Sequence, residues 1–199
     1  MKKISNKLST ALFSLFLGGL FPLLFFLLAW FGSVGRVAEN RIFMIALAGL
    51  IWGFLLNYLV LKRILAHLYS LPLWIMVMVY LFYSICLYGF FMGFPLFNLL
   101  LGIPAGLYMS QRVKEESIDR KKKTNHITSL FTSFVMLFLC FMTAFLVVSE
   151  KTFRSELKNM LNLSFVVTRP MLLGLVIIGS MVLIICQYFL TSYYFSKGE

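Results

Sequence analysis

Charged residues are scarce in this sequence. Of its 199 residues, 13% are charged and 61% are apolar, whereas a soluble domain has about 25% charged and roughly 45–50% apolar residues. This composition excludes a soluble globular domain. It also excludes a disordered chain, because disordered segments contain too few apolar residues to form a core. We therefore expect a membrane protein.

Asp, Glu, Lys, Arg and His are absent from six long apolar runs. About 20 apolar residues of helix cross a hydrocarbon core, and the runs cover approximately residues 10–31, 42–61, 71–88, 90–110, 127–149 and 170–194. Intramembrane ionisable groups usually mark proton relays and ion pathways, so their absence argues against a proton-coupled pump. We expect an all-α fold, a bundle of six transmembrane helices that forms one integral membrane domain over residues 1–199.

Cysteine and histidine are also rare, with three and two residues. The cysteines lie singly inside apolar runs without CxxC spacing, and neither histidine belongs to an HExxH motif. We predict no metal, no cofactor and no catalytic residue, and we do not expect an enzyme. The one enzymatic alternative, acting on lipids at the cytoplasmic face, would use Glu115, Glu116, Asp119 and His126. Glu116 and Arg120, however, have the i,i+4 spacing of a solvated helical pair.

Acidic residues are outnumbered by basic ones, 7 against 18, for a formal net charge of +11. The basic residues form short blocks between apolar runs, without a basic stripe interleaved with exposed aromatic residues, so we predict no binding to nucleic acid. With the N-terminus inside, 12 of the 18 lie on the cytoplasmic side. If the fourth run did not cross, the split would be 9 against 9. The positive-inside rule therefore favours six spans with both termini in the cytoplasm.

The chain ends and loops complete the expected layout. The first run is too long for the apolar core of a signal peptide, about 7–15 residues, so we expect an uncleaved anchor. The Lys-rich start and the abundance of Phe, Ile and Leu point to a cell membrane, specifically a bacterial plasma membrane. A basic cytoplasmic loop is expected at 111–126 and an outer amphipathic segment at 150–168. Four consecutive basic residues in that loop are suited to fixing the topology and to binding anionic lipid head groups, namely Arg120, Lys121, Lys122 and Lys123.

The fourth run differs from the others by its prolines. Pro95 and Pro104 each remove a backbone donor and clash with the preceding turn, which predicts a broken helix with freed carbonyl groups. Broken helices near mid-membrane form the binding sites of many transporters. The strongly polar side chains of the spans are Asn57, Asn98 and Gln187. We predict a substrate site from these five residues, the alternative being hydrogen bonds between helices.

Small residues point to close helix packing. Three GxxxG pairs are present, Gly49 with Gly53, Gly89 with Gly93, and Gly102 with Gly106. Such pairs let helix backbones approach closely in a membrane, where no hydrophobic effect drives helices together. Packing within the chain is the simpler interpretation, and a docking face for another subunit is the alternative.

Together these features predict a small transporter, or the substrate-binding membrane subunit of a transporter. Its ligand would be uncharged or weakly charged, since the spans hold no countercharge. The alternative is a non-catalytic partner or assembly subunit that docks another membrane protein through its GxxxG faces. Beyond the lipid bilayer, the expected partner is a membrane protein or a second copy of the chain.

Overall fold

The computed structural model describes residues 11–91, 93–149 and 168–198. Every regular element in these ranges is a helix, which confirms the predicted all-α class. The predicted outer segment at 150–168 lies outside the described residues except for its last position. Among the described residues, five helices are long and apolar enough to cross a membrane, namely Ala11–Ser33, Glu39–Ala66, Leu73–Phe90, Ile118–Ser149 and Leu173–Gly198. The chain forms two compact units, Met1–Pro72 and Leu73–Glu199, which are described in turn.

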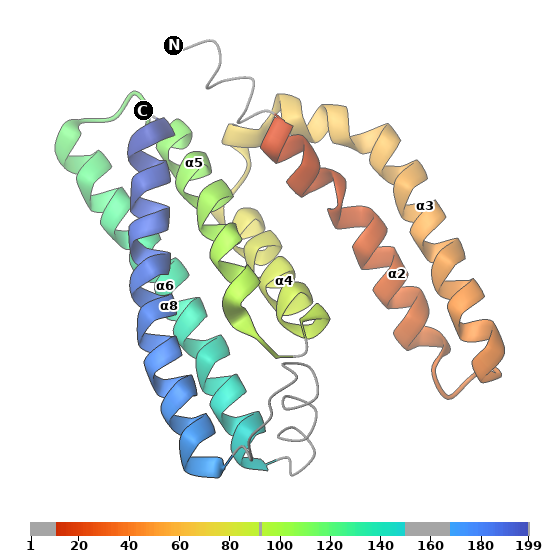
Figure 1. The fold of residues 1–199 in the computed structure, drawn as a ribbon. Helices are drawn as coiled ribbons and strands as arrows, with labels where there is room; N and C mark the ends of the chain where they lie inside the picture. Colours follow the sequence, from red (N-terminus) through yellow and green to blue (C-terminus); the bar gives the residue numbers. More distant parts are fainter. Residues whose placement is uncertain (1–10, 92, 150–167, 199) are drawn as a thin grey trace. The chain divides into compact units, whose positions relative to one another are not determined.

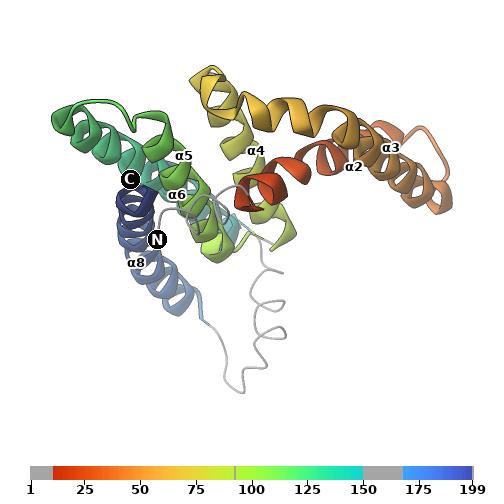
Figure 2. The ribbon, with the colours of Figure 1, turned by 90° about the horizontal axis from the view of Figure 1, so that it is seen from above.

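The first unit is a helical hairpin (Figures 1 and 2). Residues 11–18 are helical, and after a turn residue the chain continues as α2, Leu20–Ser33. At the end of α2, Oγ of Ser33 donates a hydrogen bond to the carbonyl of Ala29, 2.7 Å away. Gly35 then adopts a φ of 74°, a left-handed conformation that favours glycine. This turn brings α3, Glu39–Ala66, back along α2.

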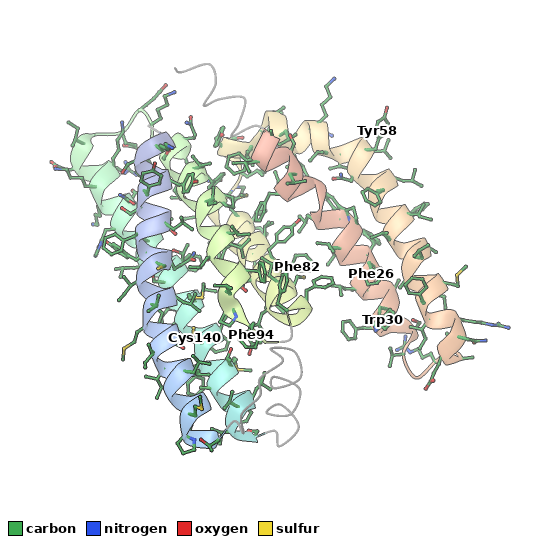
Figure 3. The ribbon with its side chains drawn as sticks, in the orientation of Figure 1. Phe26, Trp30, Tyr58, Phe82, Phe94 and Cys140 are labelled. Atoms are coloured by element: carbon green, nitrogen blue, oxygen red, sulfur yellow. The ribbon has the colours of Figure 1, made fainter. Side chains whose placement is uncertain are left out.

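Glycines of α3 allow this close packing. A Cβ atom at Gly49 would lie 2.6 Å from the carbonyl oxygen of Phe25, and one at Gly53 would lie 2.6 Å from Cα of Pro22. Any side chain would therefore push the two helices apart. The opposite face of α3 carries large apolar and aromatic residues, among them Tyr58, which points away from α2 and is 86% exposed (Figure 3). Such a face is suited to contact with lipid.

The second unit contains four segments, each antiparallel to the next along the chain (Figure 1). They are α4 (Leu73–Phe90), the 3₁₀ helix η2 (Pro95–Leu101) continued by α5 (Gly102–Arg112), α6 (Ile118–Ser149) and α8 (Arg169–Gly198). Figure 2 shows α5, α6 and α8 side by side, and contacts among these three helices dominate the unit. Nε2 of Gln111 donates to the carbonyl of Gly198 at 2.5 Å, so the connection after α5 and the end of α8 lie at the same end of the unit. The six-span topology requires this arrangement.

The fourth apolar run is not one continuous α-helix. Its regular part comprises the 7 residues of η2 followed by the 11 of α5. With a rise of about 2.0 Å per residue in a 3₁₀ helix and about 1.5 Å in an α-helix, the two extend about 30 Å, the thickness of a hydrocarbon core. The run is thus long enough to cross, although α5 alone is too short.

The predicted loop at 111–126 is largely helical, which corrects the sequence interpretation. Only residues 113–117 connect α5 to α6, and α6 starts at Ile118. The following residues contain neither proline nor glycine, and Asp119 in the first turn interacts favourably with the helix dipole. Arg120 Nη1 and Glu116 Oε2 form an exposed ion pair at 3.0 Å across the helix start. The polar sequence of this segment therefore correctly indicated an exposed position, but most of the segment is helix and not loop.

Candidate functional site

The break after α4 is held by a glycine turn. Gly93 has a φ of 84°, and its amide donates to the carbonyl of Tyr88 at 2.8 Å, as at glycine-capped helix ends. Its own carbonyl accepts a hydrogen bond from Oγ1 of Thr143 on α6, at 2.7 Å. The turn is therefore anchored to α6, and it directs the chain into η2 within the membrane segment.

The two prolines mark helix starts rather than kinks. Pro95 opens η2, and Pro104 is the third residue of α5. The first residues of a helix have no intrahelical acceptor for their amides, so a proline there costs little. The predicted interruption of the helix is present, but Gly93, rather than a clash of either proline with a preceding turn, ends α4. The break is set by Gly93 and by the change from 3₁₀ to α geometry.

Gly102 and Gly106 place α5 directly on α8. A Cβ atom at Gly102 would lie 2.8 Å from Oγ1 of Thr191 and 2.9 Å from Nε2 of Gln187. A Cβ atom at Gly106 would lie 2.9 Å from the amide nitrogen of Phe195 and would also collide with backbone of α8 one turn earlier. The absence of side chains thus brings the backbone of α5 against the polar residues of α8.

Buried hydroxyl groups link α8 to α6. Oγ1 of Thr132 and Oγ1 of Thr191 are 2.9 Å apart, and Thr132 also donates to the carbonyl of Ser129 at 3.1 Å. Oγ of Ser133 donates to the carbonyl of Ile184 at 3.4 Å. The side chains of Thr132, Thr191 and Ser129 are fully buried. The interface between α6 and α8 is therefore partly polar although both helices are apolar in composition.

Two buried amides extend this polar region to α4. Nε2 of Gln187 donates to the hydroxyl of Tyr80 at 3.4 Å, and Nδ2 of Asn98 donates to the backbone carbonyl of Ser84 at 2.8 Å. Gln187 lies about 16 Å from the Gly198 end of α8, near the middle of a core about 30 Å thick. The structure thus brings Asn98 and Gln187 into one polar cluster. Its members are each at most 7% exposed, namely Tyr80, Ser84, Asn98, Thr132, Gln187 and Thr191.

The cluster contains acceptors that no described residue satisfies. Oδ1 of Asn98 and Oε1 of Gln187 are buried without a hydrogen-bond partner in the described part of the chain. The partner of Asn98 Nδ2 is a carbonyl, which only accepts, so the orientation of this amide is fixed and its oxygen is the group left over. For Gln187 the partner is a hydroxyl, which donates or accepts, so either orientation leaves one end of the amide unpaired.

An unpaired buried acceptor costs about 1–3 kcal/mol. Native proteins leave few such groups, and those that remain call for a water, an ion or a ligand. Because the cluster joins four segments around a break in one of them, it has the composition of a small-molecule site. It has acceptors for a ligand that donates hydrogen bonds, and it has no ionised side chain.

The remaining predicted residues lie elsewhere. Asn57 belongs to α3 in the first unit and faces Gly18, with its Nδ2 3.7 Å from where a Cβ atom would be. Its Oδ1 is also buried without a partner among the described residues. Gly89 has open space around it, and Gly93 forms the turn, so this third GxxxG pair does not pack two helices together.

The residues of the enzymatic alternative lie around the start of α6. Glu115 and Glu116 are in the connection, whereas Asp119 and His126 are on the helix. Nδ1 of His126 is 2.9 Å from the hydroxyl of Tyr188 on α8, and Glu116 is paired with Arg120. The described residues contain no group of three or more His, Cys, Asp or Glu side chains that could hold a metal.

Sequence reasoning missed the hydroxyl members of the cluster. Thr132, Thr191, Ser84 and Tyr80 are common in membrane helices, and a single sequence does not show which of them face one another. A signal was nevertheless present in α6, where hydroxyl residues recur at helical spacing at 128, 129, 132 and 133. Such a stripe predicts a polar face directed at another helix.

Hydrogen bonds between neighbouring helices explain most of the cluster, but not its unpaired oxygens. Known proteins supply no further constraint. Comparison with protein families, with curated proteins and with solved structures gave no match to this chain.

Proposed function

We propose that this chain is a transporter, or the substrate-binding membrane subunit of a transporter, for a small uncharged or weakly charged molecule. The observation that carries the proposal is the amide oxygen of Asn98, which is buried in the middle of the second unit without a partner in the described part of the chain. It lies just after the break in the fourth segment. A bound molecule with an N–H or O–H group would supply the missing donor.

Electrostatics favours a neutral ligand. The polar cluster contains amides and hydroxyls, and the charged side chains described in the second unit lie at its ends. Moving an isolated ion into such surroundings costs tens of kcal/mol in the idealised Born limit, unless it is paired or neutralised. A neutral donor avoids this cost and relieves the unpaired acceptors at the same time.

The docking alternative has less support. The faces of Gly49 and Gly53 are covered by α2, and those of Gly102 and Gly106 by α8. A partner helix would have to displace helices of this chain in order to reach the same glycines. These two pairs are therefore not accessible to a partner helix.

The test is the recovery of a small molecule bound to the purified protein. The tagged chain is purified from its native membrane in mild detergent, and mass spectrometry identifies the small molecules and proteins that elute with it. Asn98→Leu removes the unpaired acceptor and keeps the branching and the number of heavy atoms of the side chain. Asn57→Leu is the matched control, since it removes another buried amide with an unpaired oxygen, from the first unit.

We expect one small organic molecule in near-stoichiometric amount with the wild-type chain and with Asn57→Leu, and at least tenfold less with Asn98→Leu. A stoichiometric ATPase in the same eluate would identify the chain as a subunit of a larger transporter. No bound molecule in the wild-type sample, or full retention by Asn98→Leu, would contradict the proposal.

A further inference from the structure

The first turns of α6 project beyond the hydrocarbon core. This helix has 32 residues, about 48 Å in length, whereas the core is about 30 Å thick. The uncharged stretch 127–149 is sufficient to fill the core. Residues 118–126 therefore lie at the level of the lipid head groups, and they include four consecutive cations, Arg120 to Lys123.

Cations from two other helices gather at the same end. The hydrogen bond from Gln111 to the carbonyl of Gly198 joins the end of α5 to the end of α8. Arg112 follows Gln111, and Lys197 precedes Gly198 with its Nζ 5.1 Å from the centre of the Tyr193 ring. We call this cation-rich region the basic end, consisting of Arg112, Lys114, Arg120, Lys121, Lys122, Lys123 and Lys197.

The three consecutive lysines are not neutralised by carboxylates of the described chain. Among the described residues the ion pair at this end joins Arg120 to Glu116, and it is exposed on both sides. Lys122 and Lys123 are exposed and Lys121 is half-buried. Lysine side chains at this position extend their ammonium groups to the membrane surface, where phosphate groups lie.

Side-chain hydrogen bonds fix the height of these turns. Nδ2 of Asn125 donates to Oγ of Ser192 at 3.0 Å, and Nδ1 of His126 is 2.9 Å from the hydroxyl of Tyr188. Both contacts join α6 to α8 just inside the basic stretch. The lysines are therefore held at a constant depth next to the tyrosines of α8, which are residues typical of the membrane interface.

We propose that the basic end binds the phosphate groups of anionic phospholipids. The occupant is a lipid rather than a soluble anion, because the cations lie on helices that continue directly into the membrane. The cations face the head-group layer, and exposed apolar side chains of the same helices contact the acyl chains. This proposal is independent of the ligand at Asn98.

The test uses the full-length chain purified in a neutral detergent at low salt. Its unfolding temperature is followed while dioctanoyl phosphatidylglycerol, dioctanoyl phosphatidylcholine or inorganic phosphate is added in separate titrations. Lys121→Gln/Lys122→Gln/Lys123→Gln removes the three lysines. A control variant removes three cations of the first unit, Arg36→Gln/Arg41→Gln/Lys62→Gln, and a second control keeps the charge, Lys121→Arg/Lys122→Arg/Lys123→Arg.

Each lysine near a membrane surface raises the affinity for anionic lipid by at most about fivefold. We expect the wild type to reach half-maximal stabilisation at a phosphatidylglycerol concentration at least about tenfold lower than for phosphatidylcholine. The triple glutamine variant should lose this preference, and both controls should keep it. Three outcomes would overturn the proposal. They are equal responses to the two lipids, stabilisation by inorganic phosphate at equal concentration, and an unchanged preference in the triple glutamine variant.

Discussion

Single residues determine how closely α5 and α8 approach each other. The backbone contact at Gly106 leaves no room even for a methyl group, because Phe195 N is 2.9 Å from where its Cβ atom would be. By contrast, Gly174 on α8 has no atom within 4 Å of such a position. The same residue type therefore has a packing role at one site and none at the other.

This contrast gives a stability prediction. Gly106→Ala should destabilise the protein by about 1–3 kcal/mol, because the added methyl group must displace the backbone of α8. Gly174→Ala should be neutral or stabilising by up to about 1 kcal/mol, because alanine is the better helix former. The unfolding midpoints of both variants in detergent check this. Equal midpoints for the two variants would mean that α5 and α8 are not in backbone contact.

The sequence predicted some members of the polar cluster, and the reason is physical. Asn98 and Gln187 are conspicuous because an amide inside an apolar run must be paired or functional. Tyr80 and Thr191 are not conspicuous, since hydroxyl groups are easily accommodated in membrane helices by bonding to their own backbone. Asn57 was grouped with the other amides because a sequence does not reveal which helices face each other.

Among the elements, the fourth segment depends on one unusual backbone conformation. Gly93, with a φ of 84°, ends α4, and its carbonyl is anchored by Thr143. Its left-handed conformation could not be deduced from the GxxxG spacing, which suggested packing instead. The prolines were correctly recognised as signals of a break, but their position at helix starts follows from the turn before them.

A second stability prediction concerns this turn. Gly93→Ala should cost about 1–2 kcal/mol, because a residue with a Cβ atom is strained in the left-handed region, and because Cδ1 of Leu146 would lie only 3.1 Å away. Gly89→Ala, in α4 with open space around it, is the matched control and should not destabilise. Chemical unfolding in detergent compares the two. If Gly93→Ala is as stable as Gly89→Ala, the turn is not required for the break.

At the scale of the whole molecule, the apolar runs were sufficient to predict the class and the positions of the long helices. Such runs report burial in lipid, which does not depend on the details of packing. They did not predict the separation into two compact units, because this depends on contacts between helices. The cytoplasmic location of both termini also stays a prediction, since it rests on the distribution of basic residues.

This topology can be measured with single cysteines. Ser117→Cys, in the exposed connection between α5 and α6, and Ser196→Cys, near the end of α8, should be protected from a membrane-impermeant maleimide applied to intact cells. Asn40→Cys, exposed at the start of α3, should react. All three should react after the cells are opened. Labelling of Ser117→Cys in intact cells would show that the fourth segment does not cross.

The seating of α5 on α8 has a consequence for biosynthesis. A nascent chain emerges from the ribosome with its N-terminus first. The fourth segment therefore emerges well before α8, the helix whose backbone packs against α5. Until then Gly102 and Gly106 lack the helix that they pack against, although Asn98 already reaches the carbonyl of Ser84 on α4. The close packing of α5 must therefore wait until translation reaches the last helix, and a chain truncated before residue 169 would lack the surface that α5 packs against.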